Sequence, residues 1–108
     1  MRVWIFALGL TFVGSGWAAE RLPEVVRFNR NIRPIFSNNC FLCHGPDEGR
    51  RKADLRLDVE AVAKKKALVE GKLFESELWA RITSTNTEER MPPLKSKKEL
   101  TPHQIALI

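Results

Sequence analysis

The chain has few of the side chains that bind metals or cofactors. Its 108 residues include two cysteines, two histidines and two methionines, one of which is the initiator. A tetrahedral zinc site needs four ligands, so zinc would require Cys40, Cys43, His44 and the distant His103. The chain also lacks the alternating strands and helices expected around a thioredoxin-like pair of cysteines. A zinc or dithiol module is therefore only an alternative interpretation.

Long apolar runs, internal repeats and low-complexity stretches are also absent. The longest apolar stretch, residues 3–13, is shorter than the about 20 residues that span a bilayer. It follows a single arginine and precedes small residues, a pattern typical of a secretory signal peptide. With Gly16 and Ala18 at the small-residue positions, we expect residues 1–18 to be removed and the mature chain to begin at Ala19. An uncleaved membrane anchor is the alternative.

The two cysteines and one histidine form a single motif. Residues 40–44 spell C-x-x-C-H, the pattern of covalent c-type haem attachment. Two thiols separated by two residues can reach the two vinyl groups on one edge of a porphyrin, and the next residue is carried under the ring toward the iron. We predict that Cys40 and Cys43 form the thioethers and that His44 is the proximal iron ligand. A turn is expected directly afterwards, at Gly45-Pro46.

Met91 is the candidate for the sixth iron ligand. A thioether sulfur is common in electron-carrying haem proteins because it raises the reduction potential, and Met91 is the only methionine besides the initiator. Pro92 and Pro93 follow it and are expected to keep this loop extended and non-helical. We predict that Met91 is the distal ligand. The alternative is an ordinary core methionine that fills a gap.

Other residues are candidates for the haem pocket. Leu55 and Leu57 alternate with polar residues in a segment that we expect to be extended, with both leucines facing the haem. Arg56 is expected to pair either with a haem propionate or with Asp54 or Asp58, because a guanidinium matches a carboxylate. The remaining candidates are Trp79, Ile82 and Pro92.

Short helices joined by loops account for the rest of the pattern. Apolar residues three or four apart predict a helix within residues 25–39, which either begins near Pro34 or is kinked there. A second helix is predicted over residues 59–68, capped by Asp58 and ended at Gly71.

A third helix is predicted from Ser76 to Ile82. Leu78 and Ile82 lie one turn apart on one face, and Trp79 lies between them in the sequence. Trp79 either packs on the porphyrin or belongs to the core. The polar residues 83–90 are expected to form a loop that leads to Met91.

The last helix has a strong start signal. Thr101 is the expected cap, Pro102 occupies the first helical position, and Gln104 completes a capping box. His103 lies at this solvent-facing start, so we interpret it as a capping or surface residue. Only seven residues follow the cap, and so short a helix is not stable alone. We therefore expect the sequence to be the N-terminal part of a longer protein, with its last helix incomplete.

The net charge of +5 is modest and is concentrated in runs. Basic residues cluster at positions 50–52, 64–66 and 95–98. The runs suit a solvated, solubilising surface, or a cationic face that steers an acidic redox partner. No aromatic residues are interleaved with them, which argues against a nucleic-acid surface.

The sequence resembles the planctomycete-type cytochrome c domain. The likeness extends from Phe28 to Leu57 and includes the C-x-x-C-H motif, with further matches at residues 75–78, 81–82, 89–93 and 100–102. It implies haem attachment through Cys40 and Cys43 and iron ligation by His44 and Met91. It also implies a small all-α cytochrome c-like domain over residues 19–108, with three to five short helices around one covalently bound haem.

These inferences predict a domain that transfers single electrons and is not an enzyme by itself, since it requires no general acid, base or nucleophile. The expected partner is a redox protein or a later domain of the same longer chain. Nucleic acid is not expected as a partner, and membrane contact is expected only if the signal segment is uncleaved. Because signal segment and motif both indicate export, we expect a periplasmic or cell-envelope protein. The alternative is a haem-based sensor or peroxidase-like module with an open sixth position.

Overall fold

A computed structural model describes residues 20–108 of the chain. The predicted signal peptide, residues 1–18, lies outside the described residues. The described part consists of helices and loops and contains no strand. None of its helices is both long and apolar enough to cross a membrane. The predicted all-α fold is confirmed.

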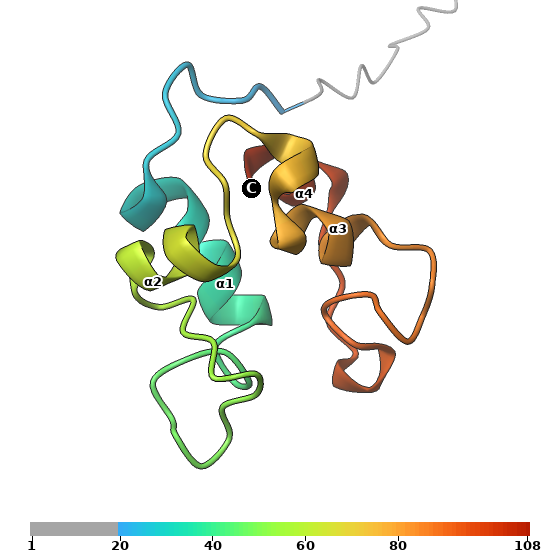
Figure 1. The fold of residues 1–108 in the computed structure, drawn as a ribbon. Helices are drawn as coiled ribbons and strands as arrows, with labels where there is room; N and C mark the ends of the chain where they lie inside the picture. Colours follow the sequence, from blue (N-terminus) through green and yellow to red (C-terminus); the bar gives the residue numbers. More distant parts are fainter. Residues whose placement is uncertain (1–19) are drawn as a thin grey trace, which may run out of the picture.

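Four short α-helices form the framework (Figure 1). They are α1 (Arg33–Asn39), α2 (Glu60–Lys66), α3 (Glu77–Thr83) and α4 (Pro102–Leu107). Single turns of other helix types accompany them: the π-helical turn η1 (Phe28–Ile32) and the 3₁₀ turns η2 (Leu73–Glu75) and η3 (Leu94–Ser96). In Figure 1, α1 and α2 lie on one side and α3 and α4 on the other. The long loops that follow α1 and α3 extend from the same end of the molecule.

The first helix changes its winding just before Pro34. The π-helical turn η1 runs directly into α1, with Pro34 in the first turn of α1. Proline has no N–H to donate, and its ring clashes with the carbonyl four residues earlier in a regular α-helix. The wider π-helical turn leaves room for that ring. The sequence allowed a start or a kink at Pro34, and the structure shows one helical segment with a change of winding.

The boundaries predicted for α2 are wrong at both ends. Val59 is the N-cap residue and no side chain caps the helix, because the Asp58 carboxylate instead accepts hydrogen bonds from Arg56 at 3.1 and 2.7 Å. These hydrogen bonds lower the pKa of Asp58. The helix ends at Lys66, before the predicted end, and Gly71 lies in the following turn with φ of 72°.

The segment from Lys52 to Asp58 is a turn followed by irregular chain, so the predicted extended conformation is wrong. Ala53 and Asp54 have φ of 54° and 47°, and the Leu55 N–H donates to the Lys52 carbonyl at 3.2 Å. The chain reverses here because it returns to the motif, as described below. Leu57 is buried in the core, and Leu55 packs against its edge.

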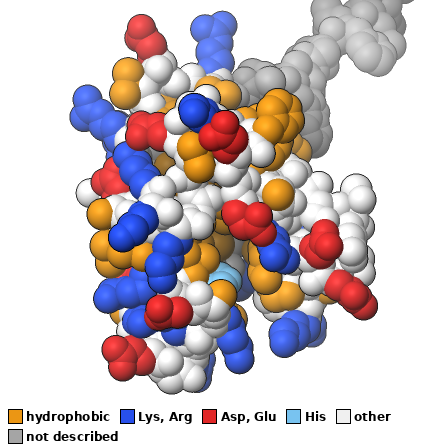
Figure 2. All heavy atoms as spheres, in the orientation of Figure 1, with side chains coloured by type: hydrophobic (Ala, Val, Ile, Leu, Met, Phe, Trp, Pro, Cys, Tyr) orange, Lys and Arg blue, Asp and Glu red, His pale blue; other side chains and the backbone are white. Residues whose placement is uncertain are grey.

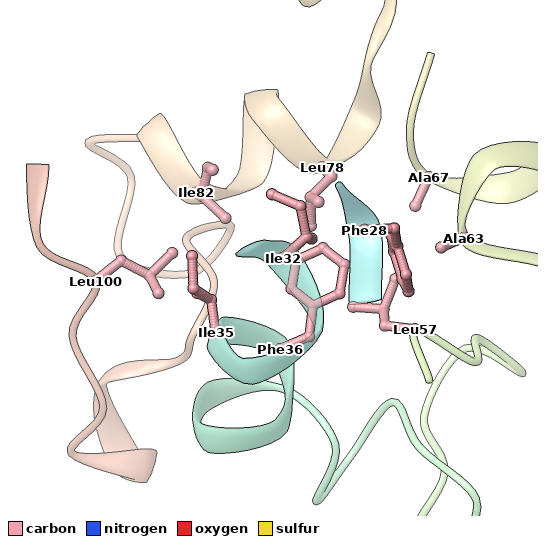
Figure 3. Close-up of a cluster of buried hydrophobic side chains, with 10 residues drawn as sticks. All are labelled: Phe28, Ile32, Ile35, Phe36, Leu57, Ala63, Ala67, Leu78, Ile82 and Leu100. Carbon is pink, nitrogen blue, oxygen red and sulfur yellow. The ribbon is translucent and has the colours of Figure 1, made fainter. Parts of the chain in front are cut away.

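The core joins the two sides of the fold around Phe36, which is fully buried (Figure 3). The ring of Phe28 packs edge-on against Phe36, with ring centroids 6.0 Å apart. Trp79 packs against the edge of this cluster, as expected for a core residue. The cluster comprises Phe28, Ile32, Ile35, Phe36, Leu57, Ala63, Ala67, Leu78, Ile82 and Leu100. Because Phe36 lies four residues before Cys40, the core fixes the end of α1 that leads into the motif.

The start of α4 has the predicted capping box. The Thr101 hydroxyl accepts a hydrogen bond from the Gln104 N–H at 3.2 Å, and the Gln104 side chain accepts one from the Thr101 N–H at 2.9 Å. His103 does not cap the helix; its Nε2 lies 3.7 Å from the Glu20 carboxylate. The predicted helix start is confirmed.

Candidate functional site

The motif continues α1 by one helical turn. The N–H groups of Cys40 and Phe41 donate to the Phe36 carbonyl at 2.7 and 3.0 Å. Those of Cys43 and His44 donate to the Cys40 carbonyl at 3.2 and 2.8 Å. Residues three and four apart are neighbours on one face of such a turn. These backbone hydrogen bonds therefore place residues 40, 43 and 44 on one turn.

Both cysteines are free thiols and half-buried. Burial, with a smaller contribution from Cys43, raises the pKa of the Cys40 thiol to about 12. The thiolate is the nucleophile in dithiol exchange, and reactive cysteines have a lowered pKa. Cys40 has the opposite property, which disfavours the dithiol alternative. Among residues 20–108, no three His, Cys, Asp or Glu side chains are grouped in a way that could hold a metal ion.

The His44 ring is oriented by a backbone carbonyl. Its Nδ1 lies 3.1 Å from the Lys52 oxygen. A carbonyl oxygen only accepts, so the neutral ring carries its hydrogen on Nδ1 and leaves Nε2 free as a ligand atom. Metal-binding histidines are commonly held this way, which fixes the tautomer and raises the basicity of the ligand nitrogen. His44 therefore fits the role of a proximal iron ligand.

The loop after the motif returns to it at two points. The Lys52 N–H donates to the Cys43 carbonyl at 2.7 Å, and the Leu57 N–H donates to the His44 carbonyl at 2.8 Å. Gly45, between the motif and this loop, approaches the preceding turn closely: a Cβ there would lie 2.3 Å from the Phe41 oxygen. The turn expected at Gly45 thus depends on the absence of a side chain.

Met91 lies in the loop after α3, which extends from the same end of the molecule as the loop that follows α1 and begins with the motif (Figure 1). Its N–H donates to the Arg81 carbonyl at 3.1 Å, and its side chain is half-buried beside a cavity of about 100 Å³. Ile82 and Leu100 of the core also line this cavity. Pro93 is extended, with φ of −66° and ψ of 150°. The space-filling view shows a notch between the two sides of the fold at this end, with a histidine visible in it (Figure 2).

The pocket candidates do not gather at one place. Leu57 and Ile82 belong to the core, Leu55 packs against the core, and Pro92 is buried beside Met91. The Arg56 guanidinium binds the Asp58 carboxylate, one of the two kinds of partner considered for it. The structure thus brings Ile82, Pro92 and Met91 together around one small cavity.

A larger groove, of about 450 Å³, lies elsewhere on the molecule. Trp79 lines it with Phe28, Ile32 and Ile108, and none of Cys40, Cys43, His44 or Met91 does. Its size therefore does not mark the candidate site, which is defined by the motif.

Sequence reasoning missed the groups that hold the motif in place. The Lys52 carbonyl is a backbone atom, and any residue type supplies one, so the sequence carries no signal for it. The sequence also gave no sign of the role of Arg51. Its guanidinium donates to the Gly45 and Pro46 carbonyls at 3.0 and 3.2 Å. It lies within a basic run and has the composition of an exposed residue.

Comparison with known proteins supports the resemblance seen in the sequence. Residues 40–95, a little more than half of the chain, match the family model described as planctomycete cytochrome C. The matched region includes the motif, Arg51, Lys52 and Met91. No curated protein and no solved structure shows a significant match to the chain.

Replacing Gly45 by alanine should destabilise the protein. A Cβ 2.3 Å from the backbone oxygen of Phe41 requires the backbone to shift, and such overpacking costs about 1–3 kcal/mol. Gly49→Ala is the matched control, because its Cβ would meet only the end of the exposed Asp47 side chain, at 3.3 Å. Thermal unfolding of both variants measures the difference. Equal losses in the two variants would contradict the tight approach at Gly45.

Proposed function

The chain belongs to the planctomycete cytochrome c family, and on this basis we propose that it carries one covalently bound haem and transfers single electrons. The observation that carries the proposal is the turn of residues 40–44. It places two half-buried thiols, of which Cys40 has a raised pKa, on the same turn as an imidazole whose Nε2 is left free. No other described group of side chains offers this combination.

Cys40 and Cys43 attach the haem by addition. Each thiol would add across one vinyl double bond, so that the sulfur would bond to one carbon and the thiol hydrogen would be transferred to the other. No group leaves, and no external oxidant or reductant is consumed in forming the bond. Their spacing of three residues puts the two sulfurs on one face of the turn, as the two vinyl groups on one porphyrin edge require.

His44 and Met91 hold the iron. His44 supplies Nε2 from the motif, and Met91 supplies its sulfur from the loop after α3. The bound haem supplies an iron that alternates between its ferrous and ferric states. The Lys52 carbonyl keeps the His44 ring in one tautomer, and Pro92 and Pro93 restrict the loop that carries Met91. With His44 and Met91 both bound, the iron would have no open position for a substrate and would serve in one-electron transfer.

Replacing Met91 by alanine tests the second ligand. The variant should lose the weak sulfur-to-iron absorption band of the ferric protein near the red end of the visible spectrum. Its reduction potential should also fall, because a thioether ligand raises that potential. Leu94→Ala, at an exposed residue of the same loop, should leave both unchanged.

Persistence of the band in Met91→Ala would contradict the assignment and place the sixth ligand elsewhere. Rapid, tight binding of carbon monoxide by the reduced wild-type protein at neutral pH would instead support the alternative of a sensor or peroxidase-like module, in which the sixth position is open.

We further propose that the partner is an acidic redox protein, or a later acidic domain of the same chain. Two of the three basic runs are largely neutralised: Arg50 lies 3.7 Å from Asp47, and Lys64 lies 2.9 Å from Glu60. Within residues 20–108, no carboxylate lies within 4.0 Å of the lysines at 95, 97 and 98. These three lysines follow Met91 closely and are exposed.

Neutralising the run at residues 95–98 should therefore slow reaction with an anionic redox reagent. The probe is hexacyanoferrate(III), and the readout is its rate of oxidising the reduced protein at several ionic strengths. Lys95→Gln/Lys97→Gln/Lys98→Gln should lower the rate several-fold at low salt and flatten its salt dependence. The control, Lys64→Gln/Lys65→Gln/Lys66→Gln, removes the same charge from the run at residues 64–66, where Lys64 and Lys66 lie within 4.0 Å of carboxylates. Equal effects of the two triple variants would refute a localised cationic face.

The N-terminal pattern supports export. We propose that residues 1–18 direct the chain out of the cytosol and are removed before Ala19, so that the domain works in the periplasm or cell envelope. Attachment of haem to a C-x-x-C-H motif in that compartment would also protect the two thiols from forming a disulfide, the usual fate of paired cysteines there.

A further inference from the structure

The loop of residues 45–54 contains a nearly buried arginine that the proposed function does not use. The Arg51 side chain is 13% exposed, whereas the side chain of its neighbour Arg50 is 65% exposed. Arginine is rarely buried unless its donors are used. The location of its hydrogen bonds therefore indicates what it does.

The Arg51 guanidinium binds backbone carbonyls of its own loop. Its Nε donates to the Gly45 carbonyl at 3.0 Å, and its Nη2 donates to the Pro46 carbonyl at 3.2 Å. These are the two residues that directly follow His44. Its only carboxylate neighbour among residues 20–108, Asp54, is distant at 3.9 Å and largely exposed. Arg51 therefore acts chiefly on the backbone of the loop.

The next residue, Lys52, makes the contacts with the motif. Its N–H donates to the Cys43 carbonyl at 2.7 Å, and its carbonyl accepts from Nδ1 of His44 at 3.1 Å. Its own side chain is exposed and forms no ion pair among residues 20–108. The position of the Lys52 backbone thus depends on the loop on either side of it. On the N-terminal side, the adjacent anchor is the Arg51 guanidinium.

From this arrangement, and resting on the proposed function, we propose that Arg51 is a positioning residue for the proximal ligand. It holds the loop so that the Lys52 carbonyl accepts from the His44 ring. A strong hydrogen bond from Nδ1 makes the imidazole a more basic ligand, and a more basic ligand favours ferric over ferrous iron. Loss of Arg51 should weaken this hydrogen bond and raise the reduction potential.

The test compares two adjacent arginines in the haem-loaded protein. Arg51→Gln removes the two contacts with the Gly45 and Pro46 carbonyls, and Arg50→Gln removes an equal charge from an exposed position. We expect Arg51→Gln to favour the ferrous form by up to about tenfold in the redox equilibrium, which corresponds to about 59 mV for one electron. We expect Arg50→Gln to leave the potential near the wild-type value.

A second readout does not depend on electron transfer. In the diamagnetic reduced protein, the ring N–H proton of His44 exchanges with solvent at a rate measurable by NMR. This exchange should be faster in Arg51→Gln than in Arg50→Gln. Arg51→Lys keeps the charge but reaches at most one of the two carbonyls, and it should be intermediate in both readouts. If Arg51→Gln yields no loaded protein, Arg51→Lys is compared with Arg50→Gln.

Equal potentials and equal exchange rates in the Arg51 and Arg50 variants would overturn the proposal. A wild-type protein that acquires no haem would overturn the proposed function, because no Soret band would appear in any variant. If the wild-type protein binds haem but the Arg51 variants change neither the reduction potential nor the exchange rate, only the role of Arg51 is overturned. The two failures are therefore distinguishable.

Discussion

The fold depends on the junction at Phe36, where the hydrophobic core and the haem motif meet. The Phe36 side chain is fully buried, while its carbonyl accepts from the N–H groups of Cys40 and Phe41. One residue thus anchors α1 in the core and starts the turn that carries the cysteines. Each such hydrogen bond is worth only about 1 kcal/mol net. Its importance is geometric, because it sets the direction in which the motif leaves the helix.

The motif is also held from its other end, by the loop that follows it. The N–H groups of Lys52 and Leu57 donate hydrogen bonds to the carbonyls of Cys43 and His44. Gly45 allows the close approach that this requires. The two sides of the fold share a small core, and small domains bury little apolar surface. A flat apolar group bound between the motif and the Met91 loop would add contacts to both sides. The proposed haem would therefore serve the structure as well as electron transfer.

Features carried by side-chain identity could be predicted from the sequence. The capping box of Thr101 and Gln104, the apolar face around Phe36 and the C-x-x-C-H spacing all depend on residue types at fixed intervals. Features carried by the backbone could not be predicted. Alternation at Leu55 and Leu57 suggested an extended segment, but the chain turns at Ala53 because it must return to the motif.

Competition between local partners explains the other errors. Asp58 is a good helix cap by residue type, yet its carboxylate binds Arg56 in preference to the backbone of α2. Ser76, for which no capping role was predicted, shows the same competition, because its hydroxyl accepts from the Val69 N–H at 2.8 Å and does not cap α3. In both cases the sequence shows the candidate group, and only the fold shows which partner reaches it.

The central claim is that one haem is bonded to Cys40 and Cys43, and the intact mass of the exported protein tests it most directly. After production with a c-type maturation system and denaturation, the account predicts the mass of the chain from Ala19 plus one haem, with a Soret band that survives extraction by acidified solvent. A colourless protein whose mass is that of the polypeptide alone, with two titratable thiols, would contradict it.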